Sequence, residues 1–85
     1  MKVIFHDKAL KGLSYWKKTN NIVIINKIKQ LIEDIQQHPF TGLGKPEPLK
    51  NELSGYWSRR ITQEHRLIYR VEEDCIIIVQ CRFHY

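Results

Sequence analysis

Residues 56–83, "YWSRRITQEHRLIYRVEEDCIIIVQCRF", decide the fold of this chain. Hydrophobic and polar residues alternate through most of this stretch, which is the period of a strand with one face in a core. The pattern predicts three strands, at residues 56–61, 66–71 and 75–83. Because the segments between them are short, neighbouring strands are expected to form antiparallel hairpins.

The preceding residues predict one more strand, two helices and a loop. The stretch "KVIFH" (2–6) is rich in branched and aromatic residues, as strands are. Apolar residues recur at helical spacing over residues 7–18, where Asp7 is the expected cap, and again over residues 22–38. Three prolines and two glycines in "PFTGLGKPEPLK" (39–50) make a regular element improbable there.

This order of elements predicts an α+β domain. Two N-terminal helices should pack on one face of a small, mainly antiparallel sheet, which leaves the other face open for a site. The expected buried side chains of the helices are Ala9, Leu10, Leu13 and Trp16 in the first, and Ile22, Val23, Ile25, Ile28, Leu31, Ile32 and Ile35 in the second.

The composition bounds the class of protein. The chain has 85 residues, 42% of them hydrophobic, which fits one small globular domain over residues 1–85. No apolar run has the length of a membrane span, and the first residues lack the apolar block of a secretion signal, so a cytoplasmic protein without membrane contact is expected. Cys75 and Cys81 would lie roughly 20 Å apart along one strand, too far for a disulfide. They are expected to be packed, unreactive thiols.

The charge of the chain suggests a polyanionic partner. The net charge is +5, and basic and aromatic residues are interleaved in the second half of the chain. Such a surface suits single-stranded RNA or DNA, whose bases stack on aromatic rings. Alternatively, strand alternation places arginines outward only to solvate them, and composition alone slightly favours this second interpretation. The residues concerned are Lys45, Lys50, Arg59, Arg60, Arg66, Arg70 and Arg82, with Phe40, Tyr56, Trp57, Tyr69, Phe83 and Tyr85.

The first predicted hairpin raises the question of where its arginines point. If Ile61 pairs with His65 across a three-residue tip, Arg60 and Arg66 become cross-strand neighbours on one face. Like charges in that position are unfavourable, and a protein tolerates them more readily when an anion lies between them. A two-residue tip would instead put the two arginines on opposite faces.

Three kinds of side chain could together cleave RNA without a metal. A base must take the proton from the 2′-hydroxyl, cations must hold the charge on the phosphoryl oxygens, and an acid must protonate the departing 5′ oxygen. By residue type these roles fit Glu47, Arg66 with Arg60, and His84. Glu47 lies among lysines that favour its ionised form, and histidine suits an acid near neutral pH. The competing interpretations are a surface salt bridge for Glu47 and an ordinary terminal residue for His84.

Other chemistries have weaker support in the sequence. The four histidines are scattered, and no Cys/His spacing resembles a zinc motif. The stretch "TGLGKPEP" (41–48) lacks the spacing and the preceding strand of a phosphate-binding loop. We therefore expect neither a metal nor another cofactor.

Two segments carry a resemblance to a known family. "GKPEPLKNELSGYWSRRITQEHRLIYRV" (44–71) and "CRFHY" (81–85), with "SYW" (14–16) and the matching length, closely resemble the YoeB (Txe) family of RelE-type bacterial toxins. The resemblance implies a compact, microbial-ribonuclease-like fold. It also implies a toxin that enters the ribosomal A site and cuts the bound mRNA without a metal, which arrests translation.

The same resemblance implies partners. They are the ribosome, mRNA and a YefM-like antitoxin that folds on contact, with operator DNA bound only through the toxin–antitoxin complex that represses its own operon. A homodimer is possible. The two helices and "VEEDC" (71–75) differ from the family pattern, which leaves the antitoxin specificity and any dimer contacts open.

Site residues carry over by position in the family motifs. The resemblance implies Glu47 as general base, His84 as general acid, Arg66 as the phosphate-stabilising arginine, Lys50 and Arg60 as RNA-backbone contacts, and Tyr85 as a residue that orients the substrate or stacks on a base. The alternative is a non-catalytic RNA- or ribosome-binding module, or a structural partner that dimerises through its Ile-rich helix. The nuclease requires Glu47, Arg66 and His84 to converge on one phosphodiester.

Overall fold

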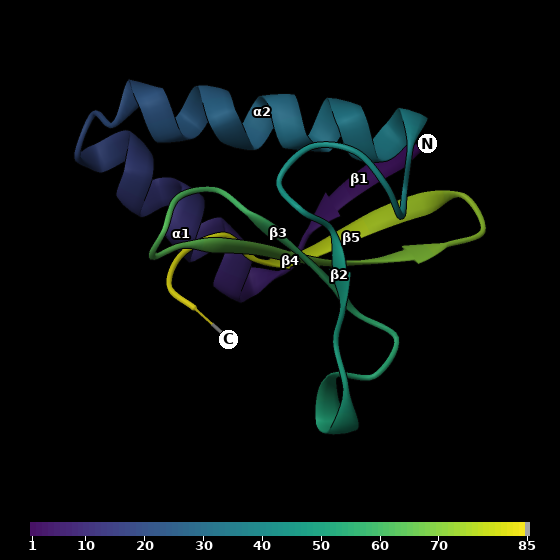
Figure 1. Cartoon of the computed structure of the whole chain (residues 1–85). Coiled ribbons are helices and arrows are strands. Elements are labelled where there is room, and N and C mark those ends of the chain that lie inside the picture. The colour runs from purple at the N-terminus through teal and green to yellow at the C-terminus, as the bar shows by residue number, and fades with distance from the viewer. Residues whose placement is uncertain (85) are drawn as a thin grey trace.

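The computed structural model describes residues 1–84, and its elements form two helices on a five-stranded sheet (Figure 1). The strands lie in the order β1-β5-β4-β3-β2. The predicted α+β architecture is confirmed. In chain order the elements are β1 (Lys2–Phe5), α1 (Asp7–Lys18), α2 (Ile22–Gln37), β2 (Glu47–Pro48), a 3-10 turn (Asn51–Leu53), β3 (Trp57–Arg60), β4 (Arg66–Glu72) and β5 (Cys75–Gln80).

The three C-terminal strands form the two predicted antiparallel hairpins, β3–β4 and β4–β5. Arg60 pairs with Arg66, and the Ile61 N–H donates to the His65 carbonyl at 3.0 Å, which confirms the three-residue tip. Strand β1 joins the other edge of β5 in parallel, so the sheet is mixed.

Both helices cover the same face of the sheet, as predicted. Alternate strand residues point into one core, including Leu67 and Tyr69 of β4 and Ile76 and Ile78 of β5. Because successive strand residues point to opposite faces, Arg66 of β4 and Arg60 of β3 lie on the other face. In Figure 1, α2 runs along one side of the sheet, and the yellow segment that follows β5 lies on the opposite side.

The buried faces of the helices differ partly from the expectation. In α2 the buried side chains are Ile24, Ile28, Leu31 and Ile35, whereas Val23 is 79% exposed and Ile22 is 54% exposed. At about 100° per residue, Ile22 and Val23 lie at least a quarter-turn from that stripe. In α1, Leu10 is exposed. Gly12 is buried and lies so close to Cys81 that a Cβ at this position would be 3.0 Å from its Sγ.

The helix starts were also predicted only in part. His6, not Asp7, is the N-terminal cap of α1. Asp7 lies in the first turn, where its negative charge interacts favourably with the positive end of the helix dipole. Asn21 caps α2, since its Oδ1 accepts from the Ile24 N–H at 3.2 Å. Within residues 1–84, neither helix has the length and apolar character needed to cross a bilayer.

Cys75 and Cys81 are both free thiols, as expected. Cys81 is fully buried, and its thiol lies 3.3 Å from the Ala9 carbonyl oxygen. Burial raises the pKa of Cys81 to about 11, so this thiol stays protonated and unreactive near neutral pH.

Candidate active site

The open face of the sheet carries a hollow of about 520 Å³. Four of the six residues implied by the family resemblance line it: Glu47, Arg60, Arg66 and His84. They come from β2, β3, β4 and the C-terminal segment. Segments far apart in the sequence therefore meet at one place. The full lining is Lys45, Pro46, Glu47, Pro48, Ser58, Arg60, Arg66 and His84.

The two remaining predicted residues lie elsewhere. Lys50 lines an adjoining hollow of about 320 Å³, which shares Glu47 and Pro48 with the first. Tyr85 lies outside the described residues, so its expected position has no structural counterpart here.

Glu47 is held on a short edge strand. The sequence made a regular element improbable here, and this expectation was wrong. Glu47 pairs with Ser58 and Pro48 pairs with Trp57, which adds the two-residue strand β2 to β3. Proline is compatible with an edge strand because the missing N–H leaves no inner ladder bond unmade. The backbone that carries Glu47 is therefore fixed against the strand that carries Arg60.

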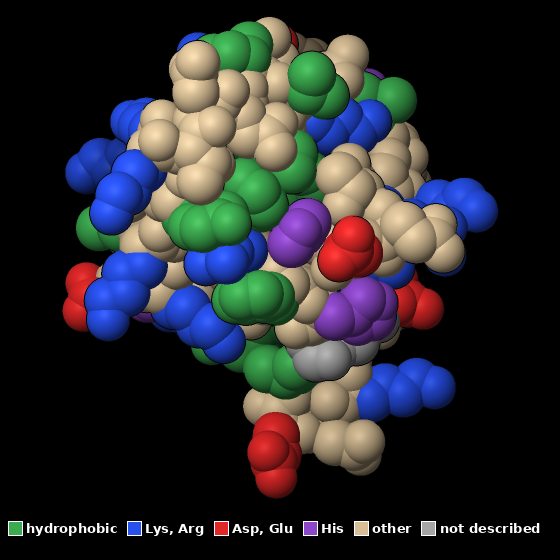
Figure 2. Space-filling view, turned by 90° about the vertical axis from the view of Figure 1, so that its left-hand side faces the viewer, with side chains coloured by type: hydrophobic (Ala, Val, Ile, Leu, Met, Phe, Trp, Pro, Cys, Tyr) green, Lys and Arg blue, Asp and Glu red, His purple; other side chains and the backbone are tan. Residues whose placement is uncertain are grey.

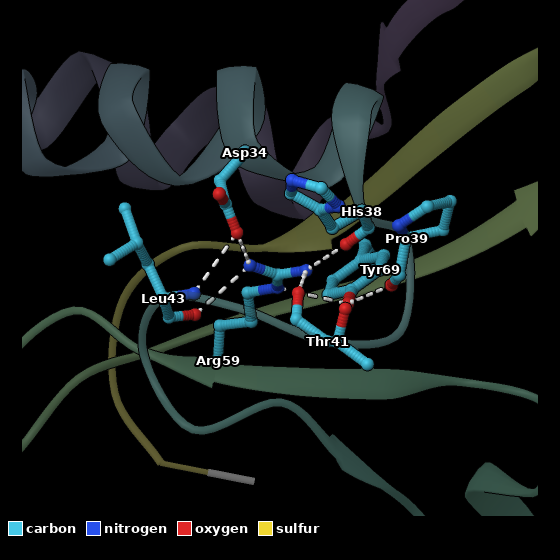
Figure 3. Close-up of polar contacts among 7 residues, drawn as sticks. All are labelled: Asp34, His38, Pro39, Thr41, Leu43, Arg59 and Tyr69. Carbon is cyan, nitrogen blue, oxygen red and sulfur yellow. Dashed lines mark hydrogen bonds and ion pairs between the residues drawn. The ribbon is translucent and has the colours of Figure 1, made fainter.

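The loop before β2 is anchored by Arg59 (Figure 3). This residue was counted among the outward-facing basic residues, but its exposed fraction is 0% and its side chain points towards α2. The guanidinium uses all of its N–H donors. The acceptors are Tyr69 Oη (3.1 Å), Asp34 Oδ2 (2.6 Å) and the carbonyl oxygens of Leu43 (3.0 Å), His38 and Thr41 (2.7 Å).

The surroundings of Arg59 shift the ionisation of its partners. The hydrogen bond from Arg59 to Asp34 holds the pKa of that carboxyl below its usual value. Asp34 Oδ2 also accepts from the Leu43 N–H at 3.0 Å. Burial raises the pKa of Tyr69, whose hydroxyl donates to the Pro39 carbonyl at 2.7 Å. The loop over residues 38–43 is thus tied to α2 and to the sheet at several points.

The two arginines of the hollow form a cross-strand pair of like charge. Arg66 Nη1 donates to the carbonyl oxygens of Thr62 (2.8 Å), Gln63 (3.1 Å) and His65 (3.2 Å), so the guanidinium is folded over the hairpin tip. Arg60 is exposed at the rim. Like charges at paired positions of neighbouring strands are unfavourable, and an anion bound between the two arginines would relieve that cost.

His84 reaches the hollow by a different route from the one predicted. Strand β5 ends at Gln80, not at residue 83. The chain then turns at Phe83, whose φ is 67°. The Phe83 carbonyl accepts from the Arg66 N–H at 3.0 Å, and Gln80 Nε2 donates to the His84 carbonyl at 3.0 Å. These bonds place the segment that carries His84 beside Arg66.

The predicted basic and aromatic surface is smaller than expected. Arg59 and Tyr69 are both buried, whereas Phe40 and Phe83 are exposed. Figure 2 shows Lys and Arg side chains gathered along its left side, with histidine side chains near the middle of the same face. Within residues 1–84, no group of three or more His, Cys, Asp and Glu side chains is arranged to hold a metal ion.

Sequence reasoning missed Ser58. Its side chain is 2% exposed, lies opposite Glu47 in the register and lines the hollow. The available signal was its parity, because Ser58 and Arg60 are two residues apart and so share a face.

A larger hollow of about 610 Å³ lies beside α2. Lys27 is the one charged side chain in its lining, so it lacks an acid–base pair. The lining residues are Val23, Ile24, Asn26, Lys27, Gln30, Ile61 and Thr62. The smaller hollow on the open face is therefore the candidate site.

Known sequences resemble this chain over its whole length. The pattern of the YoeB-like toxins of bacterial type II toxin-antitoxin systems matches residues 5–85. The chain belongs to this toxin family. Toxin YoeB of Escherichia coli (strain K12) is 51% identical over 85 residues, which cover 100% of both chains.

Solved structures of family members have the same fold. A YoeB/ParE toxin from Agrobacterium tumefaciens matches with a TM-score of 0.95 at 45% identity, covering 100% of both chains. YoeB from Staphylococcus aureus, solved as a dimer and in complex with YefM, matches with TM-scores of 0.92 and 0.91 at 38% and 40% identity. Those two matches cover 100% of this chain and 98% of the relative. The family inferred from the motifs is confirmed.

Proposed function

We propose that this toxin is a ribosome-dependent mRNA endonuclease, or mRNA interferase, that cuts mRNA in the ribosomal A site and so inhibits translation. The observation that carries the proposal is the convergence of Glu47, Arg60, Arg66 and His84 on one hollow. A carboxylate, two guanidinium groups and an imidazole are the groups that metal-independent RNA cleavage requires. Membership of a toxin family supports the same conclusion.

The proposed reaction is an intramolecular transfer at one phosphodiester. Glu47 takes the proton of the ribose 2′-hydroxyl, and that oxygen attacks the adjacent phosphorus. Arg66 and Arg60 stabilise the negative charge that grows on the non-bridging oxygens. Protonated His84 gives its proton to the departing 5′ oxygen. The products are a 2′,3′-cyclic phosphate and a 5′-hydroxyl, and proton exchange with water restores both catalytic groups.

Two further residues complete the proposed site. Lys50 lies on the adjoining hollow, and we assign it, with Arg60, to the RNA backbone on either side of the cut. Tyr85 is assigned to orienting the substrate or stacking on a base. Aromatic stacking on a base is typical of single-strand recognition.

The proposed partners are mRNA on the ribosome and an antitoxin. The S. aureus relative forms a complex with YefM, which supports a YefM-like antitoxin for this chain. Together they would bind operator DNA and repress their own operon. The S. aureus relative also occurs as a dimer, so a homodimer is included in the proposal. Action on ribosomes implies a cytoplasmic location.

The proposal is tested with ribosomes that hold a defined codon in the A site. Glu47→Ala and His84→Gln should each slow single-turnover cleavage by about 10²–10⁴-fold, the usual contribution of a general base or acid. Binding to the ribosome should change little, because neither residue is assigned to hold the RNA backbone. Mapping the mRNA ends gives the site of cleavage, and co-sedimentation gives the binding.

Matched controls are available in the chain. Glu52→Ala and His6→Gln change an exposed carboxylate and an exposed imidazole outside the hollow, and should cut at the rate of the unchanged toxin. Ribosome binding and growth arrest without any cut would overturn the nuclease and leave a non-catalytic ribosome-binding module.

A further inference from the structure

Phe83 connects the proposed acid to the first hairpin. Its backbone N–H donates to His65 Nδ1 at 2.8 Å, and its carbonyl accepts from the Arg66 N–H at 3.0 Å. Two consecutive residues of the hairpin, His65 and Arg66, therefore hydrogen-bond to one residue of the C-terminal segment. The next residue along the chain is His84.

The backbone conformation of Phe83 requires stabilising contacts of this kind. Its φ of 67° lies in the left-handed region, where a bulky side chain is strained and persists only if the surroundings impose it. Strand β5 has already ended at Gln80, and the two residues before Phe83 are held to α1: Trp16 Nε1–H donates to the Cys81 carbonyl at 2.9 Å, and the Arg82 guanidinium lies 3.3 Å from the Tyr15 ring centroid. Gln80 Nε2 adds bonds to the carbonyl oxygens of Phe83 (3.3 Å) and His84 (3.0 Å). All of these hydrogen bonds go to carbonyl oxygens, whereas the bond from the Phe83 N–H goes to the His65 side chain.

His65 is itself held in place. Its ring packs edge-on against Trp16 with centroids 4.8 Å apart, and Trp16 is 4% exposed. The His65 N–H donates to Thr62 Oγ1 at 3.2 Å. Because the Phe83 amide can only donate, Nδ1 must carry the lone pair and the ring proton lies on Nε2. The imidazole is therefore a fixed acceptor on the hairpin side of the contact.

We propose that His65 is a positioning residue that, through the Phe83 amide, holds the C-terminal segment so that His84 stays in the hollow. The catalytic part of this inference rests on the proposed function. His65 contacts neither substrate nor reacting atoms in this account. Since His65 and Arg66 are adjacent and both bind Phe83, one hairpin end sets the position of the phosphate-binding arginine and of the acid together.

Two substitutions separate the hydrogen bond from the packing. His65→Phe keeps an aromatic ring against Trp16 but removes the acceptor. His65→Asn loses the ring but places a carbonyl oxygen near the position of Nδ1. If the bond matters, Asn should restore what Phe loses. If only packing matters, Phe should be the milder change.

The first measurement is amide hydrogen exchange of the full toxin. In His65→Phe, the Phe83 amide should exchange at least about 10-fold faster, while the amides of β4 and β5 keep their protection. In His65→Asn, the Phe83 amide should stay close to its protection in the unchanged toxin. Equal protection of Phe83 in all three proteins would overturn the inference, whatever the toxin does to RNA.

The second measurement is cleavage on programmed ribosomes. His65→Phe should lower kcat by up to about 100-fold, the size expected for a small misplacement of a catalytic group, with KM for the ribosome nearly unchanged. His65→Asn should recover most of the rate. A loss that is the same for Phe and Asn, or that appears in KM alone, would contradict the positioning role. If the unchanged toxin cuts no RNA, the proposed function fails, and the exchange experiment still decides whether His65 holds the segment.

Discussion

At the scale of single residues, the buried phenol of Tyr69 is the most informative. Its hydroxyl donates to the Pro39 carbonyl at 2.7 Å and accepts from Arg59 Nε at 3.1 Å. Burial raises its pKa, so the hydroxyl stays protonated and able to donate across the physiological range. Tyr69 thereby links the loop after α2, through the Pro39 carbonyl, to Arg59, the side chain that anchors the same loop.

Tyr69→Phe should lower the free energy of unfolding by about 1–3 kcal/mol, because a partly buried carbonyl and a buried N–H each lose a partner. Urea denaturation measures this change. Tyr56→Phe is the matched control: its hydroxyl accepts from Arg70 Nη1 at 2.9 Å in a partly exposed place, and a surface change is expected to stay within about 0.5 kcal/mol. Equal effects of the two substitutions would show that the buried network contributes nothing measurable.

Arg59 marks the limit of prediction at this scale. Alternation put Arg60 and Arg66 on one face only if the hairpin tip has three residues, which is the tip that the structure has. Arg59 was counted as basic surface although its parity is that of the core. A buried arginine needs a partner on another element, here Asp34, twenty-five residues earlier. Local sequence patterns carry no information about that pairing.

At the scale of elements, the Arg59–Asp34 ion pair ties β3 to α2. Because the pKa of Asp34 is lowered in the folded protein, the carboxylate contributes stability at pH values above its unfolded pKa. That contribution is lost as the pH falls through the unfolded value and then through the lower folded value. The loss should therefore begin near about pH 5 and continue below the ordinary aspartate pKa of about 3.9.

This pH dependence is tested with Asp34→Asn. The unchanged toxin should be the more stable protein at neutral pH, and the gap between the two unfolding free energies should shrink as the pH falls below about 5. Urea denaturation across the acid range gives both curves, and carboxylates shared by the two proteins cancel in the difference. A gap that stays constant with pH would contradict the ion pair's assigned role.

Elements with a clear period were predicted well, and elements set by tertiary contacts were not. The two hairpins and both helices follow from alternation and helical spacing. Strand β2 has only two residues. It is a strand because Glu47 and Pro48 pair with β3, a tertiary contact that the local sequence does not indicate. The end of β5 at Gln80 was missed because apolar residues continue to Phe83, although there they pack on α1 and the first hairpin.

At the scale of the whole molecule, the sequence resemblance implied six site residues, and four of them line one hollow. Their convergence is a property of the fold, since β2, the first hairpin and the C-terminal segment meet only after the sheet has formed. Lys50 shares the adjoining hollow with Glu47 but does not line the hollow that holds Arg60, Arg66 and His84. The resemblance could not predict this arrangement, because motif positions give no spatial position for a side chain.

The central claim is that the imidazole at the end of the chain protonates the leaving oxygen of a phosphodiester held by Glu47 and the arginines. The most direct test uses a programmed ribosome whose mRNA carries sulfur in place of the 5′ bridging oxygen at the cut. A thiolate leaves without protonation, so His84→Gln should cut this mRNA within about 10-fold of the unchanged toxin, while its loss on normal mRNA stays at about 10²–10⁴-fold. Glu47→Ala should remain slow on both. If His84→Gln is equally impaired on both substrates, His84 is not the acid and the account is contradicted.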